Sequence, residues 1–172
     1  MKPSGTFLYF AYGSNMLSAR LLARTPSAVV LGRARLSSYS LAWHKVGIDD
    51  TGKCDIVPSG HAGDHVHGVA YQIRLAELRH LDLAEELGTG YFAGSVAIDV
   101  NGRQRLARTY RAIPTDPILK PLTWYKRFVV EGAREHGLPS SYIARLKAAP
   151  ALPDPDRNRS NTNWRISNRR SA

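Results

Sequence analysis

The chain has 172 residues, 43% of them hydrophobic, with 24 Lys and Arg against 14 Asp and Glu and therefore a formal charge of +10. This length and composition predict one folded domain and exclude a disordered or fibrous chain. The single cysteine, Cys54, excludes an internal disulfide, and no segment has the roughly 20 apolar residues of a membrane span or the pattern of a signal peptide. We therefore expect a soluble, cytoplasmic protein that has no membrane partner.

The first half of the chain predicts strands around one short helix. Aromatic and apolar residues from Phe7 to Tyr12 indicate a buried strand, which breaks off at Gly-Ser-Asn. Helical spacing over residues 16–22 predicts a helix with Ser14 or Asn15 as its N-cap. Further strands are predicted over residues 28–36, 39–43, 53–57 and 66–73.

The second half predicts helices and one hairpin. Leucines recur on one face of residues 75–87, which indicates an amphipathic helix that ends at Gly-Thr-Gly. The pair Asn101-Gly102 predicts a tight turn between two strands. These strands are expected over residues 91–100 and 104–113, and two helices over residues 124–135 and 140–148. This mixed order favours an α+β fold, a small mixed β-barrel with antiparallel hairpins and a few flanking helices, over a doubly wound sheet.

The last segment, residues 149–172, is polar and rich in arginine, with few periodic apolar positions. It is predicted to be a flexible basic tail outside the folded domain of residues 1–148. Trp164 is the one residue that could dock it. The positive charge could attract phosphates or nucleic acid, but no RNP-type or helix-turn-helix pattern occurs, so we do not expect a nucleic-acid partner.

The turn Tyr12-Gly13-Ser14-Asn15 lies between a predicted strand and a predicted helix, where unpaired backbone N–H groups and the helix dipole attract a carboxylate or phosphate. Gly13 would allow a ligand to approach closely, and Ser14 and Asn15 add side-chain donors. The same residue types are common in purely structural turns, so both interpretations stay open. The turn has no Walker, G-x-G-x-x-G or G-x-S-x-G pattern.

Two acidic residues, Glu85 and Glu86, stand at the end of the predicted helix 75–87. A helix C-terminus and an adjacent carboxylate both favour the protonated form of a carboxyl group, which suits a general acid or base. The alternative is a solvated helix end, because most glutamates are exposed.

The histidine-rich stretch offers a second candidate site, with His61, Asp64, His65 and His67. A His-x-His pair on a strand places both imidazoles on one face, as a metal site requires. No second cluster supplies further ligands, so we predict no metal and no cofactor. Nothing in the sequence places Cys54 beside a histidine either, as nucleophilic catalysis would require.

Four segments together resemble the γ-glutamylcyclotransferase family in order and spacing. They are FAYGSNM (residues 10–16), GDHVHGVAY (63–71), LDLAEELGTGY (81–91) and WYKRFVVEGAREHGLPSSY (124–142). The similarity runs from about residue 7 to about residue 148. It implies an α+β fold around a mixed barrel, with the turn at residues 12–15 at the mouth of a cavity.

The resemblance also implies an enzyme. Members cyclise a γ-glutamyl amino acid or amine to 5-oxoproline and release the amine, an intramolecular acyl transfer of the lyase type that uses no cofactor. The matching catalytic residue is Glu85, or Glu86 if the register differs by one, because the family usually has glycine where Glu86 stands. The matching substrate-binding residues are Tyr12, Gly13, Ser14, Asn15, Tyr91 and Tyr125.

The resemblance also bears on the substrate and the assembly, and two alternative functions stay open. The glutathione-specific relatives carry another residue at the place of Asn15, so glutathione itself is not the expected substrate. The expected partner is a small γ-glutamyl molecule, and the protein is expected to be a monomer or homodimer. The alternatives are a carboxylate-binding module of the same fold without turnover, or a basic surface that binds anions or nucleic acid.

Overall fold

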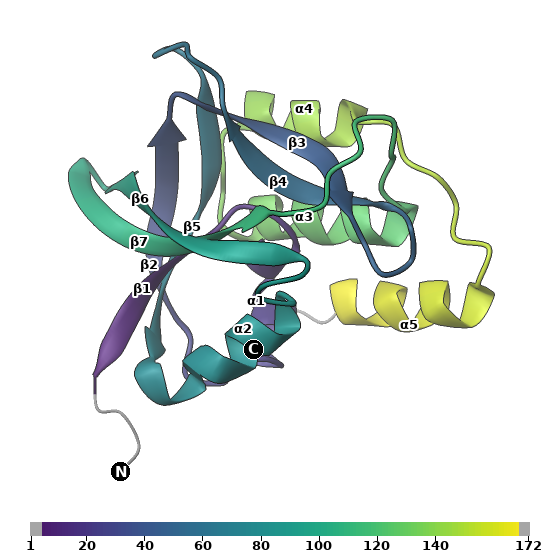
Figure 1. Cartoon of the computed structure of the whole chain (residues 1–172), viewed down its shortest axis with the longest axis horizontal. Coiled ribbons are helices and arrows are strands. Elements are labelled where there is room, and N and C mark those ends of the chain that lie inside the picture. Colours follow the sequence, from purple (N-terminus) through teal and green to yellow (C-terminus); the bar gives the residue numbers. More distant parts are fainter. Residues whose placement is uncertain (1–4, 169–172) are drawn as a thin grey trace.

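A closed five-stranded β-barrel forms the centre of the computed structural model, which describes residues 5–168 (Figure 1). Its strands follow the order β1-β5-β2-β6-β7. Their bounds are Thr6–Ala11 (β1), Val29–Ser37 (β2), His65–Arg74 (β5), Tyr91–Val100 (β6) and Arg103–Ala112 (β7). A two-stranded sheet of β3 (Tyr39–Val46) and β4 (Gly52–Pro58) stands beside the barrel. The predicted α+β class and small barrel are confirmed.

Strand pairing follows the local turn chemistry. Strands β6 and β7 are antiparallel neighbours joined at Asn101 and Gly102, whose φ angles of +53° and +77° are those of a type I′ turn. A parallel contact between β1 and β7, at Tyr9 and Arg108, closes the barrel. The antiparallel pairing of β6 with β7 across this turn confirms the predicted hairpin.

Helix α3 (Thr123–Glu135) packs against residues 14–16, which follow β1, and α4 (Ser140–Ala148) packs against α3. The apolar face of α3 joins the core, where Phe128 and Val129 have no exposed area. Gly132 lets this helix approach the chain after β1, because a Cβ there would lie 2.5 Å from the backbone nitrogen of Leu17. The packing of α3 thus fixes the position of the turn that follows β1.

The helix after β1 differs from the prediction. It is divided into a 3₁₀ turn, η1 (Ser14–Met16), and the five-residue helix α1 (Ser18–Leu22). The residues before them, Gly13 and Leu17, are the N-caps, and neither makes a side-chain capping bond. The prediction of Ser14 or Asn15 as an N-cap was wrong, because both side chains bond to other residues instead.

The acidic helix is also shorter than predicted. A 3₁₀ turn, η2 (Leu75–Glu77), leads into α2 (Leu78–Ala84), so the helix ends before the two glutamates rather than at residue 87. The backbone reverses at Glu86, whose φ of +50° lies in the left-handed region and cannot continue a right-handed helix.

The predicted flexible tail contains a helix, α5 (Arg157–Ser167), which lies under α3 in Figure 1. Asp156 caps it by accepting a bond from the backbone N–H of Arg159 at 3.0 Å. Trp164 packs against the core under the guanidinium of Arg127, 4.1 Å from the ring centroid. The expectation of an unstructured segment was wrong for residues 157–167, because docking of Trp164 compensates for a polar sequence. Its last four residues, 169–172, lie outside the described part.

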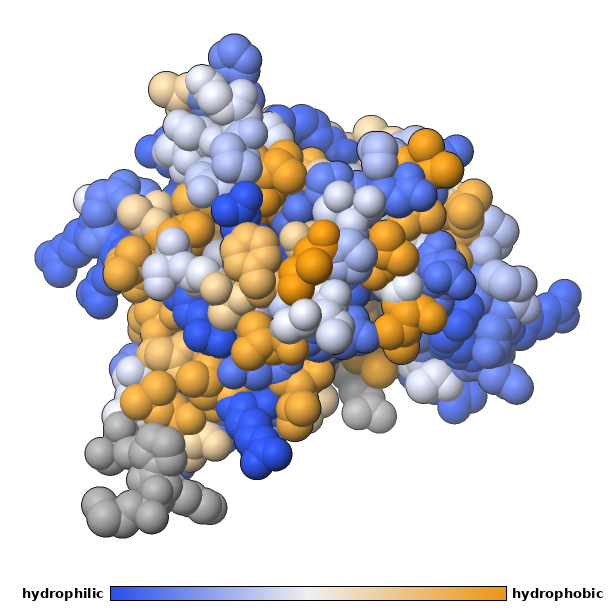
Figure 2. Space-filling view, in the orientation of Figure 1, coloured by the Kyte–Doolittle hydropathy of each residue, from blue (hydrophilic) through white to orange (hydrophobic). Residues whose placement is uncertain are grey.

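The surface of α5 is hydrophilic in the view of Figure 2, where blue residues cover this helix at the right of the molecule. None of the helices between residues 5 and 168 is long and apolar enough to cross a membrane.

Candidate active site

A small recess of about 30 Å³ opens where the end of β1 meets β4, β6, β7 and α3. Its walls come from residues far apart in the sequence. They are Tyr9, Tyr12, Gly13, Ser14, Asn15, Cys54, Glu85, Tyr91, Tyr110 and Tyr125. The structure therefore brings together all of the predicted site residues except Glu86, the alternative acid.

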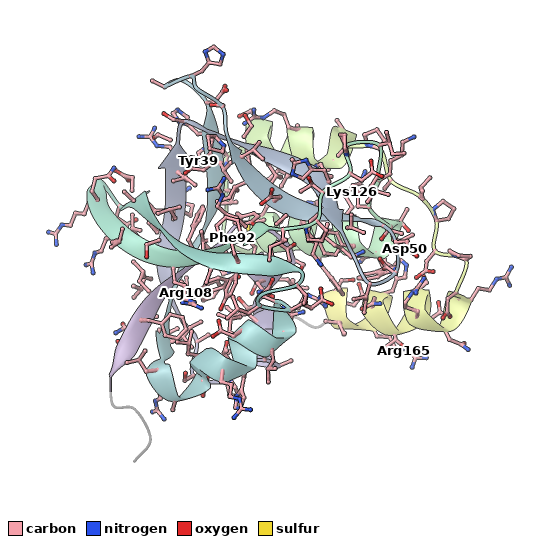
Figure 3. The ribbon with its side chains drawn as sticks, viewed as in Figure 1. Tyr39, Asp50, Phe92, Arg108, Lys126 and Arg165 are labelled. Carbon is pink, nitrogen blue, oxygen red and sulfur yellow. The ribbon has the colours of Figure 1, made fainter. Side chains whose placement is uncertain are left out.

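A larger cavity of about 420 Å³ adjoins the recess, and we call it the outer chamber. The two share Ser14, Glu85, Tyr91 and Tyr125 as common walls. The rest of the chamber comes from α1, the end of α2, α3, α5, and the strands β3 and β4 with their connection. Figure 3 labels Asp50 in that connection, above α5 in the view. The site thus consists of a narrow inner part and a wider outer part that meet at Glu85.

Glu85 is held by two donors at the boundary of these cavities. Its Oε1 accepts hydrogen bonds from Asn15 Nδ2 at 2.8 Å and from Arg24 Nη1 at 2.9 Å, and the side chain is 14% exposed. No described residue donates to Oε2. The two donors fix the orientation of the carboxylate through Oε1 and leave Oε2 as an available acceptor.

Asn15 positions this carboxylate rather than capping a helix. Its Nδ2 also donates to the Tyr9 hydroxyl at 2.9 Å, and its Oδ1 accepts from Arg24 Nη1 at 2.8 Å. Both ends of the amide are therefore occupied by protein groups. The backbone N–H groups of Ser14 and Asn15, in contrast, donate to no residue within 5–168.

Glu86 faces away from the recess. Its Oε2 accepts a bond from Lys45 Nζ at 2.8 Å, and this pair lines the outer chamber. The reversal of the backbone at Glu86 sends the two adjacent side chains in different directions. Of the two predicted acids, Glu85 is the one that lines the recess beside Asn15.

Tyrosine hydroxyls close the inner end of the recess. Tyr125 accepts a bond from the backbone N–H of Cys54 at 3.0 Å, and Tyr91 donates to the Cys54 carbonyl at 2.8 Å. Tyr12 donates to the carbonyl of Tyr110 at 2.5 Å. Burial raises the pKa of Tyr12, Tyr91 and Tyr125 well above 10.0, so these phenols are neutral at physiological pH.

Cys54 lines the recess but is not an activated nucleophile. Burial raises the pKa of its thiol to about 12, although a hydrogen bond with Tyr125 acts in the opposite direction. The thiolate is the nucleophilic form of cysteine, and this environment disfavours it.

The histidine-rich stretch lies elsewhere. His65 and His67 stand on β5 with ring centroids 6.3 Å apart, and His67 packs against Tyr142 at 4.9 Å. Across residues 5–168, no group of three or more His, Cys, Asp or Glu side chains could hold a metal ion. Burial lowers the pKa of His67, which is the response of a packed imidazole to lost solvent.

Several residues of the site were missed by sequence reasoning. Arg24 touches Glu85, Tyr9 touches Asn15, and Arg20 donates from Nε to Ser14 Oγ at 3.1 Å. The spacing of Arg20 and Arg24, four residues apart after the turn, was the available signal, because such a pair shares one helical face. Nothing local indicated that Arg159 of α5 would line the outer chamber.

Comparison with known proteins places this geometry in a family. The AIG2-like family profile matches residues 65–146. Curated γ-glutamylcyclotransferases of Mus musculus and Homo sapiens are 33% and 32% identical over 161 residues, covering 83% of this chain and 78% of each relative. A solved γ-glutamyl cyclotransferase superposes with a TM-score of 0.84 at 28% identity, over 94% of this chain and 99% of that one. The chain belongs to the γ-glutamylcyclotransferase family.

Proposed function

We propose that this protein is a cofactor-free γ-glutamylcyclotransferase. It cyclises the γ-glutamyl part of its substrate to 5-oxoproline and releases the amine. The observation that carries the proposal is the carboxylate of Glu85, fixed through Oε1 by Asn15 and Arg24 at the junction of the two cavities. The names of the curated relatives support the same reaction.

Glu85 acts first as a base and then as an acid. Its carboxylate removes a proton from the neutral α-amino group of the γ-glutamyl substrate as the nitrogen attacks the γ-carbonyl carbon. A new C–N bond closes the five-membered ring as the carbonyl oxygen takes the negative charge. When the oxygen returns to a carbonyl, the old C–N bond breaks and Glu85 gives the proton to the leaving nitrogen. No water is consumed.

The turn after β1 supplies the donors that this reaction needs. Ser14 and Asn15 line the recess, and their backbone N–H groups have no described acceptor. They would bind the substrate α-carboxylate or the developing oxyanion. This assigns the anion site to two free N–H groups of η1, not to the dipole of a long helix, since α1 has only five residues.

The neutral tyrosines shape the recess. Tyr12, Tyr91 and Tyr125 form rigid walls with engaged hydroxyls, so they would hold the substrate in a bent conformer in which the amine already faces the carbonyl. Such positioning supplies much of the rate of an intramolecular reaction. With Gly13, Ser14 and Asn15 they constitute the substrate-binding residues of this proposal.

The wider biological setting belongs to the same proposal. A buried, protonated thiol at Cys54 suits a reducing, cytoplasmic compartment. A γ-glutamyl amino acid or amine other than glutathione is the proposed substrate, and a monomer or homodimer the proposed assembly. Helix α5 carries three arginines and no acidic residue, and its Arg159 lines the outer chamber, so its charge serves this chamber in the proposal rather than nucleic acid.

Glu85→Gln is the direct test, with Glu86→Gln as the matched control. The purified proteins would be incubated with γ-glutamyl-alanine and with γ-glutamyl-ε-lysine, and 5-oxoproline followed by mass spectrometry. Loss of the proton-transfer group should lower kcat by about 10²–10⁴-fold in Glu85→Gln, while Glu86→Gln stays within about threefold of wild type.

If Glu85→Gln were as active as wild type, Glu86 rather than Glu85 would be the general base and acid. A wild-type protein that forms no 5-oxoproline, yet is stabilised against heat by a γ-glutamyl ligand, would instead be a binding module of the same fold.

A further inference from the structure

Tyr9 of β1 lines the recess, and its side chain is buried, with the residue only 5% exposed. Its hydroxyl oxygen lies 2.9 Å from Asn15 Nδ2, and the same nitrogen lies 2.8 Å from Glu85 Oε1. Because both oxygens bond to one trigonal nitrogen, they are about 5 Å apart. A single bound group can therefore contact both the phenol of Tyr9 and the carboxylate of Glu85.

Arg24 determines the direction of the hydrogen bond between Asn15 and Tyr9. A guanidinium only donates hydrogen bonds, so the amide atom that lies 2.8 Å from Arg24 Nη1 is the oxygen of Asn15. The amide nitrogen therefore faces Tyr9 and Glu85 and donates one hydrogen to each. Since the Tyr9 oxygen is the acceptor in this bond, its own hydroxyl proton stays available, and no residue within 5–168 accepts it.

The other phenols that line the recess have no such free proton, because each bonds to a protein acceptor. Tyr12 donates to the carbonyl of Tyr110, Tyr91 donates to the carbonyl of Cys54, Tyr110 donates to Asp82, and Tyr125 shares a hydrogen bond with the thiol of Cys54. Burial, with the negative charge of Glu85 as the next cause, raises the pKa of Tyr9 well above 10.0, so its phenol is protonated at neutral pH. Of the phenols in the recess, Tyr9 is thus the one that can donate to a ligand.

The proposed reaction creates an acceptor for this proton. Glu85 must reach both the attacking and the leaving nitrogen, so the γ-carbonyl carbon to which both are bonded lies beside its carboxylate. Attack turns the neutral carbonyl oxygen into an oxyanion, and a hydrogen bond to a charged oxygen is stronger than one to a neutral oxygen. A donor that the fold already holds in a buried site stabilises this charge without rearrangement.

We propose that Tyr9 is a further catalytic residue, whose hydroxyl donates a hydrogen bond to the γ-carbonyl oxygen as that oxygen becomes an oxyanion. The proton stays on the phenol throughout, and no covalent bond to Tyr9 is made or broken. The inference rests on the proposed cyclisation at Glu85 and adds a donor to it. Tyr9 then serves the developing oxyanion, and the backbone N–H groups of Ser14 and Asn15 serve the α-carboxylate of the substrate.

Tyr9→Phe is the test variant, because it removes the hydroxyl and keeps the ring that packs against Tyr110. Its kcat for γ-glutamyl-alanine should fall about 10²–10³-fold, because the hydrogen bond gains its full strength only in the transition state. For the same reason KM should change by less than about threefold. On the acidic side, the pH at which kcat/KM is half-maximal should not change, since Glu85 keeps both of its donors.

Tyr142→Phe is the matched control, because it removes the hydroxyl of another buried tyrosine, which lines neither cavity. It should have the kcat of wild type, and thermal melting of both variants would show that the fold is kept.

Three results with Tyr9→Phe would overturn the inference. The first is a kcat within about threefold of wild type. The second is a raised KM with an unchanged kcat, because Tyr9 would then bind the α-carboxylate in the ground state. The third is a shift of the acidic half-maximal pH together with the fall in kcat, because Tyr9 would then act on Glu85 through Asn15. Absence of 5-oxoproline from wild type would instead overturn the proposed function itself.

Discussion

Glu85 and Glu86 are neighbours in the chain, yet their carboxylates have different partners. Glu85 lies between Asn15 and Arg24 at the recess, whereas Glu86 pairs with Lys45 in the outer chamber. The positive φ of Glu86 separates them, and this conformation costs a residue with a Cβ about 1–2 kcal/mol relative to glycine. We infer that the ion pair of Glu86 with Lys45 offsets this strain.

Replacing Glu86 by glycine compares the stabilisation by its ion pair with the cost of its positive φ angle. Glu86→Gly should lower the free energy of unfolding by about 1 kcal/mol, because relief of the φ strain is smaller than the loss of the partner of Lys45. The Lys45 side chain is only 3% exposed, so it is left charged and without its carboxylate. Urea unfolding measures the change.

The double variant Lys45→Met/Glu86→Gly removes both the strain and the buried charge, so it should be more stable than Glu86→Gly. If the double variant is no more stable than the single one, the ion pair does not compensate for the backbone strain.

At the scale of elements, α5 is a polar helix that forms part of the wall of the outer chamber. The side chain of Asp154, which has 0% exposed area, accepts bonds at 2.7 Å from Trp124 Nε1 and from Nε and Nη2 of Arg159. These bonds hold the pKa of Asp154 well below its usual range, with Arg159 as the main cause. Trp124 and Arg159 both line the outer chamber, so Asp154 joins α5 to the wall of the site. In Figure 3 the labelled Arg165 of the same helix points away from the body of the protein.

Asp154→Ala should release α5 from α3, because it removes the acceptor shared by Trp124 and Arg159. Limited trypsin digestion should then cleave within residues 157–165 several times faster than in wild type, as detected by mass spectrometry of the fragments. Asp99→Ala, which removes an acceptor of the β6–β7 turn, is the control and should leave this cleavage unchanged. An unaltered cleavage rate in Asp154→Ala would show that Trp164 alone docks the helix.

At the scale of the whole molecule, the fold buries seven of its eight phenols. Seven of the eight tyrosines have a pKa raised above the ordinary 10.0, with burial as the largest cause. They come from strands and helices on all sides of the barrel interior and the recess. Their ionisation is therefore coupled to the integrity of the whole fold.

This coupling predicts alkaline unfolding. Below pH 10 the tyrosines are protonated in both states and do not affect stability. Above pH 10 the unfolded chain loses these protons while the folded chain keeps them, so the unfolded state is favoured as the pH rises. Tyrosinate absorbance at 295 nm should rise together with the loss of the circular dichroism signal. Full tyrosinate absorbance in a protein that keeps its folded circular dichroism would contradict the prediction.

Much of the architecture could be predicted because its signals are local. The aromatic, apolar run of β1, the Asn101-Gly102 turn and the leucine face of η2 and α2 depend on neighbouring residues, and the structure has these elements within a few positions. Helix ends were less predictable. Glu85 and Glu86 were expected in the last turn of a helix, but the backbone reverses at residue 86, whose side chain pairs with Lys45, 41 residues away.

By itself, the sequence determined the strand that ends in Tyr-Gly-Ser-Asn, the acidic residue that follows α2 and the family motifs, because each is a short run of residues with its own conformational preference. Only the tertiary structure decided that Arg24 holds Glu85 and that α5 forms a wall of the site. These facts depend on contacts between distant segments. Such contacts form when the barrel closes and α3 packs against η1, and no local preference encodes which side chains then meet.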